Sequence, residues 1–267
     1  MGTLSVSFLT DAEDEIIHLN QIDPNIDLQI KNNSALSITI ANLHLYLTEN
    51  CDWARHMQKM EQCIGDNLGS GVHSSIVPED NKIPLTAKFL PLLEQLFFAM
   101  NLDYRDVRSL ISELEEFFNG NDCEVSKAHH LLILPAFKRV FADENGFFTK
   151  QWQIFTKNVT CQDTGAVALR GLSDELLKAV CMLENWRLDD ARPVLQNAPF
   201  ANLDIFTELH SRGCAIHNFE FFRNRSCWFN LTITAEVGDV RLVKIYTVGY
   251  NPLRNWFGLP FEVVPST

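Results

Sequence analysis

The sequence predicts an α+β protein, with a helical middle and an antiparallel β-sheet formed mainly by the C-terminal third and by strands near the N-terminus. Two observations support this fold class. Apolar residues between about residues 85 and 141 recur at the spacing of helix faces. Residues 226–250 instead alternate between apolar and polar side chains on both sides of Gly238-Asp239, which is the pattern of a β-hairpin.

The N-terminal region is predicted to form strands around a short helix. Apolar and polar residues alternate over residues 36–40 and again, in opposite phase, over residues 43–47. A β-bulge or a tight bend at Ala41 and Asn42 would produce this change of phase. Residues 53–64 place four apolar side chains on one helical stripe, and a glycine-rich segment ends that predicted helix.

The middle of the chain contains two predicted helices with apolar inner faces. Residues 85–100 form the first, and Pro91 indicates that its regular part begins near Leu90, because proline favours the first turn of a helix. The second helix is predicted from Tyr104 to Phe118, and its outer face is rich in glutamate.

Two further helices are predicted after this pair. One spans about residues 126–141 with an interruption at Pro135, which cannot donate a backbone hydrogen bond. The other begins at the N-cap residue Ser173, where Asp174 and Glu175 fall in the first turn and complement the helix dipole.

The hairpin near the C-terminus is predicted with its register. A two-residue turn at Gly238-Asp239 pairs positions whose numbers add up to 477. The expected pairs include Glu236 with Arg241, Ala235 with Leu242 and Leu231 with Tyr246.

The domain organisation predicted from these patterns is a division near residue 200. Residues 1–200 would form a mixed, mainly helical and acidic region, and residues 201–267 an antiparallel β region. The boundary is soft, and a single domain is the alternative. Charge is uneven as well, because residues 1–133 contain twenty acidic and eight basic side chains, whereas residues 134–267 contain fourteen of each.

Composition restricts the classes of partner and the location. A net charge of -12 repels phosphate backbones and anionic lipids, so we expect no nucleic-acid and no membrane binding. The chain has no apolar run of the roughly 20 residues that a membrane span needs, and its acidic start does not resemble a secretion signal. Seven scattered cysteines fit a reducing compartment. We therefore expect a cytoplasmic protein, or one that is delivered to the cytoplasm of another cell by a route the sequence does not show.

One segment has the composition of a metal site. His210, Cys214, His217 and Cys227 follow a spacing that suits four zinc ligands. Residues 215–222, however, have the pattern of a strand, in which alternate side chains point to opposite faces and the potential ligands diverge. We therefore favour core packing over zinc and expect no metal and no cofactor.

Other catalytic patterns are weaker. On a helix, His56 and Cys63 would lie about 10 Å apart, which is too far for a nucleophile and its base. The glycines at Gly69 and Gly71 follow a predicted helix rather than a strand, so a dinucleotide site is not expected. A calcium loop around Gly146 would lack two obligatory carboxylates.

The sequence thus favours a non-catalytic protein that binds other proteins, such as an accessory subunit, an adaptor, an immunity protein or an effector. Its partner would be another protein or a second copy of this chain. The expected contact is an acidic, phenylalanine-rich helical surface. Its residues are Glu113, Glu115, Glu116, Phe117 and Phe118. The alternative is a metal-dependent or cysteine-based enzyme whose site is assembled from scattered histidines and cysteines.

Overall fold

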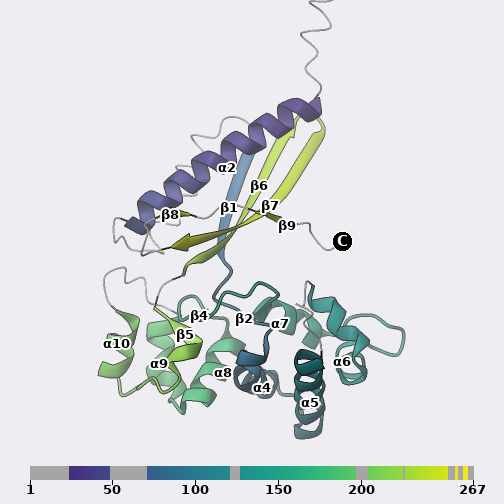
Figure 1. The fold of residues 1–267 in the computed structure, drawn as a ribbon, viewed down its shortest axis with the longest axis vertical. Helices are drawn as coiled ribbons and strands as arrows, with labels where there is room; N and C mark the ends of the chain where they lie inside the picture. The colour runs from purple at the N-terminus through teal and green to yellow at the C-terminus, as the bar shows by residue number, and fades with distance from the viewer. Residues whose placement is uncertain are drawn as a thin grey trace, which may run out of the picture.

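The protein is an α+β protein built around two hydrophobic cores, as a computed structural model shows (Figure 1). The structure describes residues 24–48, 71–120, 127–196, 204–224, 226–251, 256–257 and 261–263. We call the part formed by the long N-terminal helix and the main sheet the sheet lobe, and the part formed by residues 83–223 the helical lobe. The predicted fold class is confirmed.

The main sheet is antiparallel and is centred on the predicted hairpin. Strands β6 (Trp228–Val237) and β7 (Val240–Asn251) pair with Glu236 opposite Arg241, Ala235 opposite Leu242 and Leu231 opposite Tyr246. The predicted register is therefore confirmed. Strand β1 (Val72–Pro78) extends the sheet beside β6, while β8 (Trp256–Phe257) and β9 (Phe261–Val263) pair with β7.

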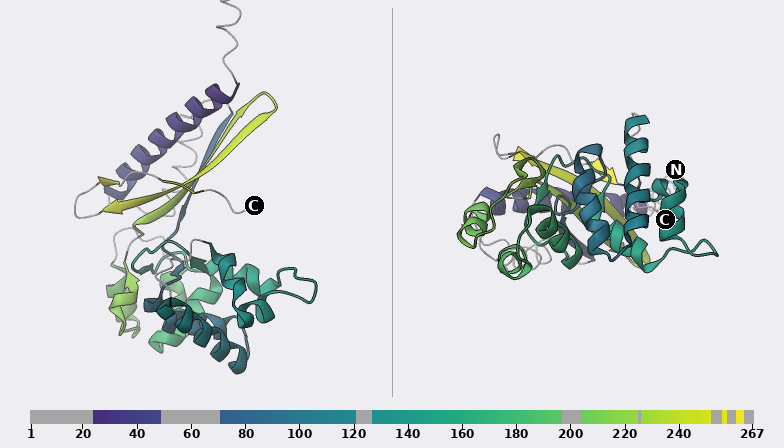
Figure 2. Two further views of the ribbon diagram at one scale, coloured as in Figure 1. Left: turned by 45° about the vertical axis from the view of Figure 1, so that its right-hand side comes forward. Right: turned by 90° about the horizontal axis from the view of Figure 1, so that it is seen from below.

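Helix α2 (Pro24–Thr48) lies across one face of this sheet (Figures 1 and 2). The prediction of strands over residues 36–47 is therefore wrong. The side chains that α2 buries recur at helical spacing, but they include two polar residues. They are Leu28, Asn32, Ala35, Thr39 and Leu43.

Asn32 is accommodated in the sheet lobe core by specific hydrogen bonds. Its Oδ1 accepts from the hydroxyl of Tyr246 at 2.6 Å, and its Nδ2 donates to the carbonyl of Ile233 at 3.4 Å. A buried amide without such partners would be costly. These bonds connect α2 to both β6 and β7.

The helical lobe is inserted between β1 and β6, and it contains short 3-10 helices, α-helices and two short parallel strand pairs (Figure 1). The strand pairs are β2 (Ile83–Pro84) with β3 (Val159–Thr160), and β4 (Val167–Ala168) with β5 (Phe222–Arg223). The helices are η1 (Ala87–Phe89), α4 (Leu90–Ala99), α5 (Tyr104–Gly120), η2 (Ala128–Ile133), α6 (Pro135–Phe141), α7 (Lys150–Asn158), α8 (Asp174–Glu184), α9 (Leu188–Leu195), α10 (Ile205–Ser211) and η3 (Phe219–Phe221).

The sequence predicted several of these helix starts correctly. Helix α4 begins at Leu90 with proline in its first turn, and α5 begins at Tyr104. The hydroxyl of Ser173 accepts from the backbone N–H of Leu176 at 3.1 Å, so Ser173 is the N-cap of α8. The interruption at Pro135 separates η2 from α6.

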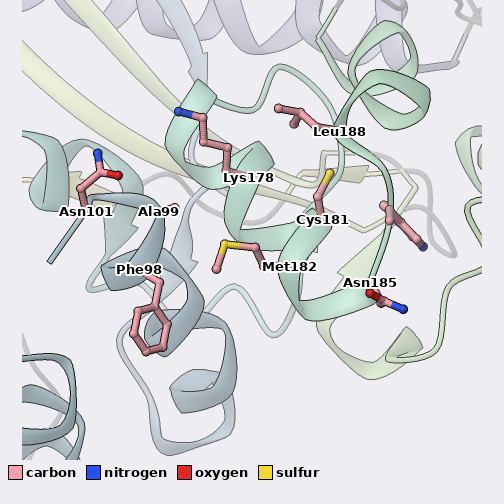
Figure 3. A pocket seen from close by; sticks show the side chains of 9 residues that line it. Phe98, Ala99, Asn101, Lys178, Cys181, Met182, Asn185 and Leu188 are labelled. Carbon is pink, nitrogen blue, oxygen red and sulfur yellow. The ribbon is translucent and has the colours of Figure 1, made fainter. Parts of the chain in front are cut away.

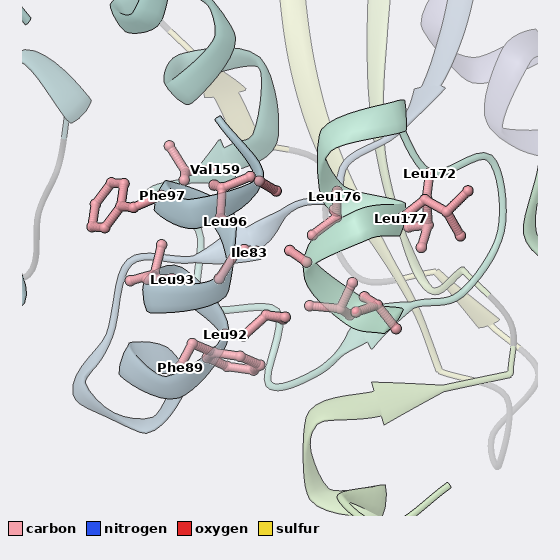
Figure 4. Close-up of a cluster of buried hydrophobic side chains, with 14 of the residues drawn as sticks. Ile83, Phe89, Leu92, Leu93, Leu96, Phe97, Val159, Leu172, Leu176 and Leu177 are labelled. Atoms are coloured by element: carbon pink, nitrogen blue, oxygen red, sulfur yellow. The ribbon is translucent and has the colours of Figure 1, made fainter. Parts of the chain in front are cut away.

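Helices α4 and α8 pack side by side in the centre of the helical lobe (Figure 4). Leu92 and Leu96 of α4 and Leu177 of α8 have no exposed surface. Buried phenylalanines from α4, α6 and α7 continue this core, and their ring centroids lie 5.3–6.3 Å apart. They are Phe97, Phe137, Phe141 and Phe155.

The two lobes are joined by two chain crossings, and buried carboxylates lie at that joint. The chain leaves the sheet lobe after β1 and returns to it before β6. Asp80 is fully buried there; its Oδ2 accepts from the backbone N–H of Cys227 at 2.7 Å and lies 3.6 Å from Nη1 of Arg223. Glu79 accepts from Nζ of Lys82 at 2.8 Å and from Nδ2 of Asn230 at 2.6 Å. The joint is therefore a polar cluster between two apolar cores.

Asp80 is expected to make stability depend on pH. Burial raises its pKa from 3.8 to about 6, although the N–H of Cys227 and the charge of Arg223 oppose this shift. The folded protein therefore binds this proton more tightly than the unfolded chain, so the contribution of Asp80 to the unfolding free energy falls as pH rises from about 4 to 6. The difference between the two pKa values corresponds to roughly 3 kcal/mol.

Asp80→Asn should remove this part of the pH dependence, because asparagine does not ionise. Urea unfolding of both proteins at pH 4.5, 5.5 and 6.5 checks the prediction. The unfolding free energy of the wild type should fall relative to that of the variant as pH rises. Parallel pH profiles would show that Asp80 does not titrate in this range.

Some predictions stay open. The helix at residues 53–64, with His56 and Cys63, lies outside the described residues. The domain boundary near residue 200 also stays a prediction. The sheet lobe takes α2 and β1 from the chain before the helical lobe and β6 and β7 from the chain after it.

Candidate functional site

A groove opens on the helical lobe where α4 and α8 end (Figure 3). Its volume is about 530 Å³, which lies in the range of ligand and side-chain binding sites. Apolar side chains form much of its lining, and two asparagines and a lysine supply the polar groups. The residues are Phe98, Ala99, Asn101, Lys178, Cys181, Met182, Asn185, Trp186 and Leu188.

Two asparagines in the left-handed conformation shape this groove. Asn101 has φ 61° just after α4, and Asn185 has φ 56° as the C-cap of α8. Asparagine adopts this conformation more readily than most residues, and it commonly ends helices. Both helices therefore stop at the groove, and the chain that leaves α8 brings Trp186 and Leu188 to its side.

The walls of the groove combine a fixed and an adaptable part. The indole Nε1 of Trp186 donates to the carbonyl of Ala215 at 2.7 Å, which fixes that ring. Phe98 stacks with Tyr104 at a centroid distance of 6.5 Å. Met182 is 48% exposed, and its flexible thioether can adapt to different shapes.

The chemistry of the groove suits binding better than catalysis. Its described lining contains neither a carboxylate nor an imidazole. Burial raises the pKa of the Cys181 thiol to about 12, so this cysteine stays protonated at neutral pH and is a poor nucleophile. The groove can hold an apolar side chain and pair its amides and the ammonium group of Lys178 with polar or acidic groups.

The residues predicted for partner binding lie near the C-terminal end of α5. Glu115 and Glu116 are exposed, while Phe117 and Phe118 are partly buried against the core and contact each other at 5.7 Å. Both carboxylate oxygens of Glu113 accept from the backbone N–H of Ala136 at 2.9 Å, so Glu113 caps the start of α6. Partner binding through these five residues stays a prediction.

The potential zinc ligands belong to different local structures. His210 is exposed on α10, Cys214 is buried just after that helix, and His217 is exposed before η3. The strand predicted over residues 215–222 is wrong apart from its end, because η3 occupies residues 219–221 and β5 begins only at residue 222. The described residues contain no group of three or more His, Cys, Asp or Glu side chains that could hold a metal ion.

Glu184 explains why this segment is not a strand. This carboxylate is 1% exposed, and it accepts from the backbone N–H of His217 at 2.6 Å, from that of Asn218 at 3.2 Å and from Nδ2 of Asn218 at 2.8 Å. These backbone donors bond to a side chain of α8 and not to a neighbouring strand. The alternation of apolar and polar residues over 215–222 therefore did not correspond to strand pairing.

Besides Cys181, two other thiols in the described part of the chain, Cys161 and Cys214, are poorly suited to nucleophilic catalysis. Burial raises the pKa of Cys161 to about 11, and it also raises that of Cys214. A reactive cysteine needs the opposite shift, which places the thiolate within reach of neutral pH. These residues therefore give no support to the alternative of a cysteine-based enzyme.

Comparisons with known proteins identify the fold. No family model matches the sequence, and no curated protein matches it significantly. Among solved structures, a chain in the crystal structure of the GspK-GspI-GspJ complex from the type 2 secretion system of enterotoxigenic Escherichia coli matches with a TM-score of 0.54 and 10% identity. The fold resembles that of GspK.

The similarity to GspK includes both lobes, because it covers 93% of this chain and 100% of the matched chain. At 10% identity it concerns the fold alone. None of the helices in the described part of the chain combines the length and apolar character that a membrane span requires.

Proposed function

We propose that this protein is a non-catalytic structural subunit that assembles with other proteins of a secretion complex, as GspK does with GspI and GspJ. The observation that supports this proposal most directly is the match of the whole fold, in which a helical lobe is inserted into a helix-on-sheet lobe. The groove agrees with it, because its residues can recognise a partner but offer neither a carboxylate nor an imidazole in the described lining.

The outer face of α2 is the surface we expect to contact a partner. Among the side chains of α2 that the structure describes, the exposed ones are uncharged, although the whole chain has a net charge of -12. The two charged residues near this face, Asp27 and Lys31, pair with each other at 3.4 Å. Interface centres are typically poor in charge. The exposed residues are Ile26, Gln29, Ile30, Asn33, Ser34, Ser37 and Ala41.

Two isoleucines make this face unusual. Ile26 is 54% exposed and Ile30 is 57% exposed, one turn apart on the same helix. Covering them with a partner would bury apolar surface on both molecules, which is the main favourable term in protein association. Helix α2 already packs its other face on the sheet, so the two faces would serve folding and assembly separately.

Co-purification with the products of genes adjacent to its own tests the proposed function. The tagged protein should form a stable complex with at least one of them, as judged by size-exclusion chromatography. Changing Ile26 and Ile30 together to Asp should weaken this complex by at least about tenfold, since charges would be buried in an apolar contact. Val240→Asp is the matched control, because Val240 is 46% exposed at the hairpin turn.

Two outcomes would count against this function. One is that no adjacent gene product binds under any condition. The other is that a complex forms equally well with the double α2 variant, which would place the contact elsewhere on the chain. The cytoplasmic location and the enzyme alternative stay predictions, and cell fractionation tests the first of them.

A further inference from the structure

The turn between α6 and α7 exposes two adjacent phenylalanines. Phe147 is 70% exposed and Phe148 is 54% exposed, whereas Phe141 at the start of the same connection is fully buried. Large aromatic side chains on a surface commonly mark contacts with other molecules. The exposure of Phe147 in particular suggests a contact with another molecule.

This turn is held in a defined conformation. Oδ1 of Asp143 accepts from the backbone N–H of Asn145 at 2.9 Å and from that of Phe147 at 2.8 Å. The N–H of Asp143 donates to the carbonyl of Phe147 at 2.8 Å, and Gly146 supplies the positive φ of 81° that the turn requires. Presenting Phe147 from an ordered turn lowers the entropy lost on binding.

Phe148 is ordered as well. Its ring stacks on that of Trp152 in the first turn of α7, with a centroid distance of 5.4 Å and an interplanar angle of 23°. The stack leaves the neighbouring Phe147 free to project. The turn also exposes the carboxylate side chains of Asp143 and Glu144. It is therefore an aromatic projection with acidic residues beside it.

The groove between α4 and α8 has the complementary chemistry. Phe98, Met182 and Trp186 line it with apolar surface, and Lys178 is the charged residue of its described lining (Figure 3). The two features occupy different parts of the helical lobe, because the turn projects beyond α6 while the groove lies where α4 and α8 end (Figure 1).

We propose that the turn of one copy of this protein docks into the groove of a second copy, with Phe147 inserted between Met182 and Phe98 and Glu144 near Lys178. The charges favour this occupant over an anionic membrane, which Asp143 and Glu144 would repel. The contact joins two different surfaces, so it is heterologous, and each added copy leaves one free turn and one free groove. It goes beyond the proposed function, because it needs no other protein.

Sedimentation velocity of the purified protein over a range of concentrations tests this contact. The average mass should rise with concentration, because a single inserted side chain gives weak association. Phe147→Ala and Met182→Glu should each weaken the association by at least about tenfold, through lost apolar contact or a charge placed in the groove. Phe219→Ala is the matched control, since Phe219 is 59% exposed elsewhere on the lobe.

Mixing the two variants distinguishes this arrangement from other modes of association. The Phe147→Ala copy keeps an intact groove and the Met182→Glu copy keeps an intact turn, so the mixture should form dimers and stop there. Phe147 is 70% exposed and Met182 is 48% exposed, so circular dichroism should show unchanged folding. A wild type that stays monomeric at every concentration, variants that associate normally, or a mixture that stays monomeric would each overturn the proposal.

Sedimentation with vesicles of phosphatidylcholine and phosphatidylglycerol separates a membrane contact from the proposed one. The wild type should remain in the supernatant. Wild-type binding that Phe147→Ala abolishes would assign the turn to lipid and overturn docking between copies. None of these measurements uses another protein, so their failure would leave the proposed assembly with other subunits untouched.

Discussion

Replacing Phe97 by alanine is expected to lower the unfolding free energy by about 4 kcal/mol, because it removes a large aromatic ring from a fully buried position. The ring lies 5.7 Å from that of Phe155, 6.2 Å from that of Phe137 and 6.3 Å from that of Phe141. These neighbours come from two other helices, α6 and α7, and cannot all move to fill the space.

Urea unfolding followed by tryptophan fluorescence measures this effect. Trp152 packs against Phe155 at 5.7 Å, so its emission reports on the same core. Phe219→Ala is a matched control with an exposed ring, and it should change the unfolding free energy by less than about 1 kcal/mol. A loss of less than about 1 kcal/mol for Phe97→Ala would mean that this ring is not packed in the core of the helical lobe.

The second large effect is expected at Glu184, where replacement by alanine should destabilise the protein by about 3 kcal/mol. The carboxylate is 1% exposed and accepts three hydrogen bonds from His217 and Asn218. Removing it leaves two backbone donors without their partner, and hydrogen bonds to a charged group are stronger than neutral ones. The connection between α10 and η3 would lose its attachment to α8.

Glu184→Gln is the matched comparison, because glutamine keeps the shape of the side chain and one acceptor oxygen. It should retain part of the stability that alanine loses. Hydrogen exchange at the amides of His217 and Asn218 should accelerate in the alanine variant, since these N–H groups bond to the carboxylate. Equal stability of wild type and alanine variant, with unchanged exchange, would show that these bonds contribute nothing to the fold.

The groove could not be predicted from the sequence, because its residues come from two segments that are about 80 positions apart. Only the packing of α4 against α8 brings Phe98 and Met182 to the same groove. Local signals did exist at its edges, since Asn101 and Asn185 each follow an apolar helix and are residues that commonly end one. They indicated the helix ends but not that both asparagines border one groove.

The role of Glu113 could not be predicted from the sequence either. Its neighbours in the sequence, Glu115 and Glu116, are exposed, and all three looked equivalent as an acidic helix face. The structure separates them, because only Glu113 faces the start of α6 and caps it. A surface predicted from one helix cannot show which of its charges another helix uses.

The C-terminal hairpin was determined by the sequence itself. The alternation of residues 228–237 and 240–251 and the turn at Gly238-Asp239 are local, so they fix both the strands and their register without help from the rest of the chain. The sequence also determined where α4 starts, at Leu90, and where α8 starts, after Ser173. These signals are local as well, because proline and an N-cap serine act on the adjacent turn.

Only the tertiary structure showed that residues 24–48 form helix α2. Its buried face contains Asn32 and Thr39 and its outer face contains Ile26 and Ile30, so the apolar residues do not form one helical stripe, and a chance alternation over residues 36–47 indicated strands. Asn32 can be buried because Tyr246, more than 200 positions later in the chain, donates a hydrogen bond to it. A polar residue becomes a core residue only when its partner is in place, and the sequence does not show that partner.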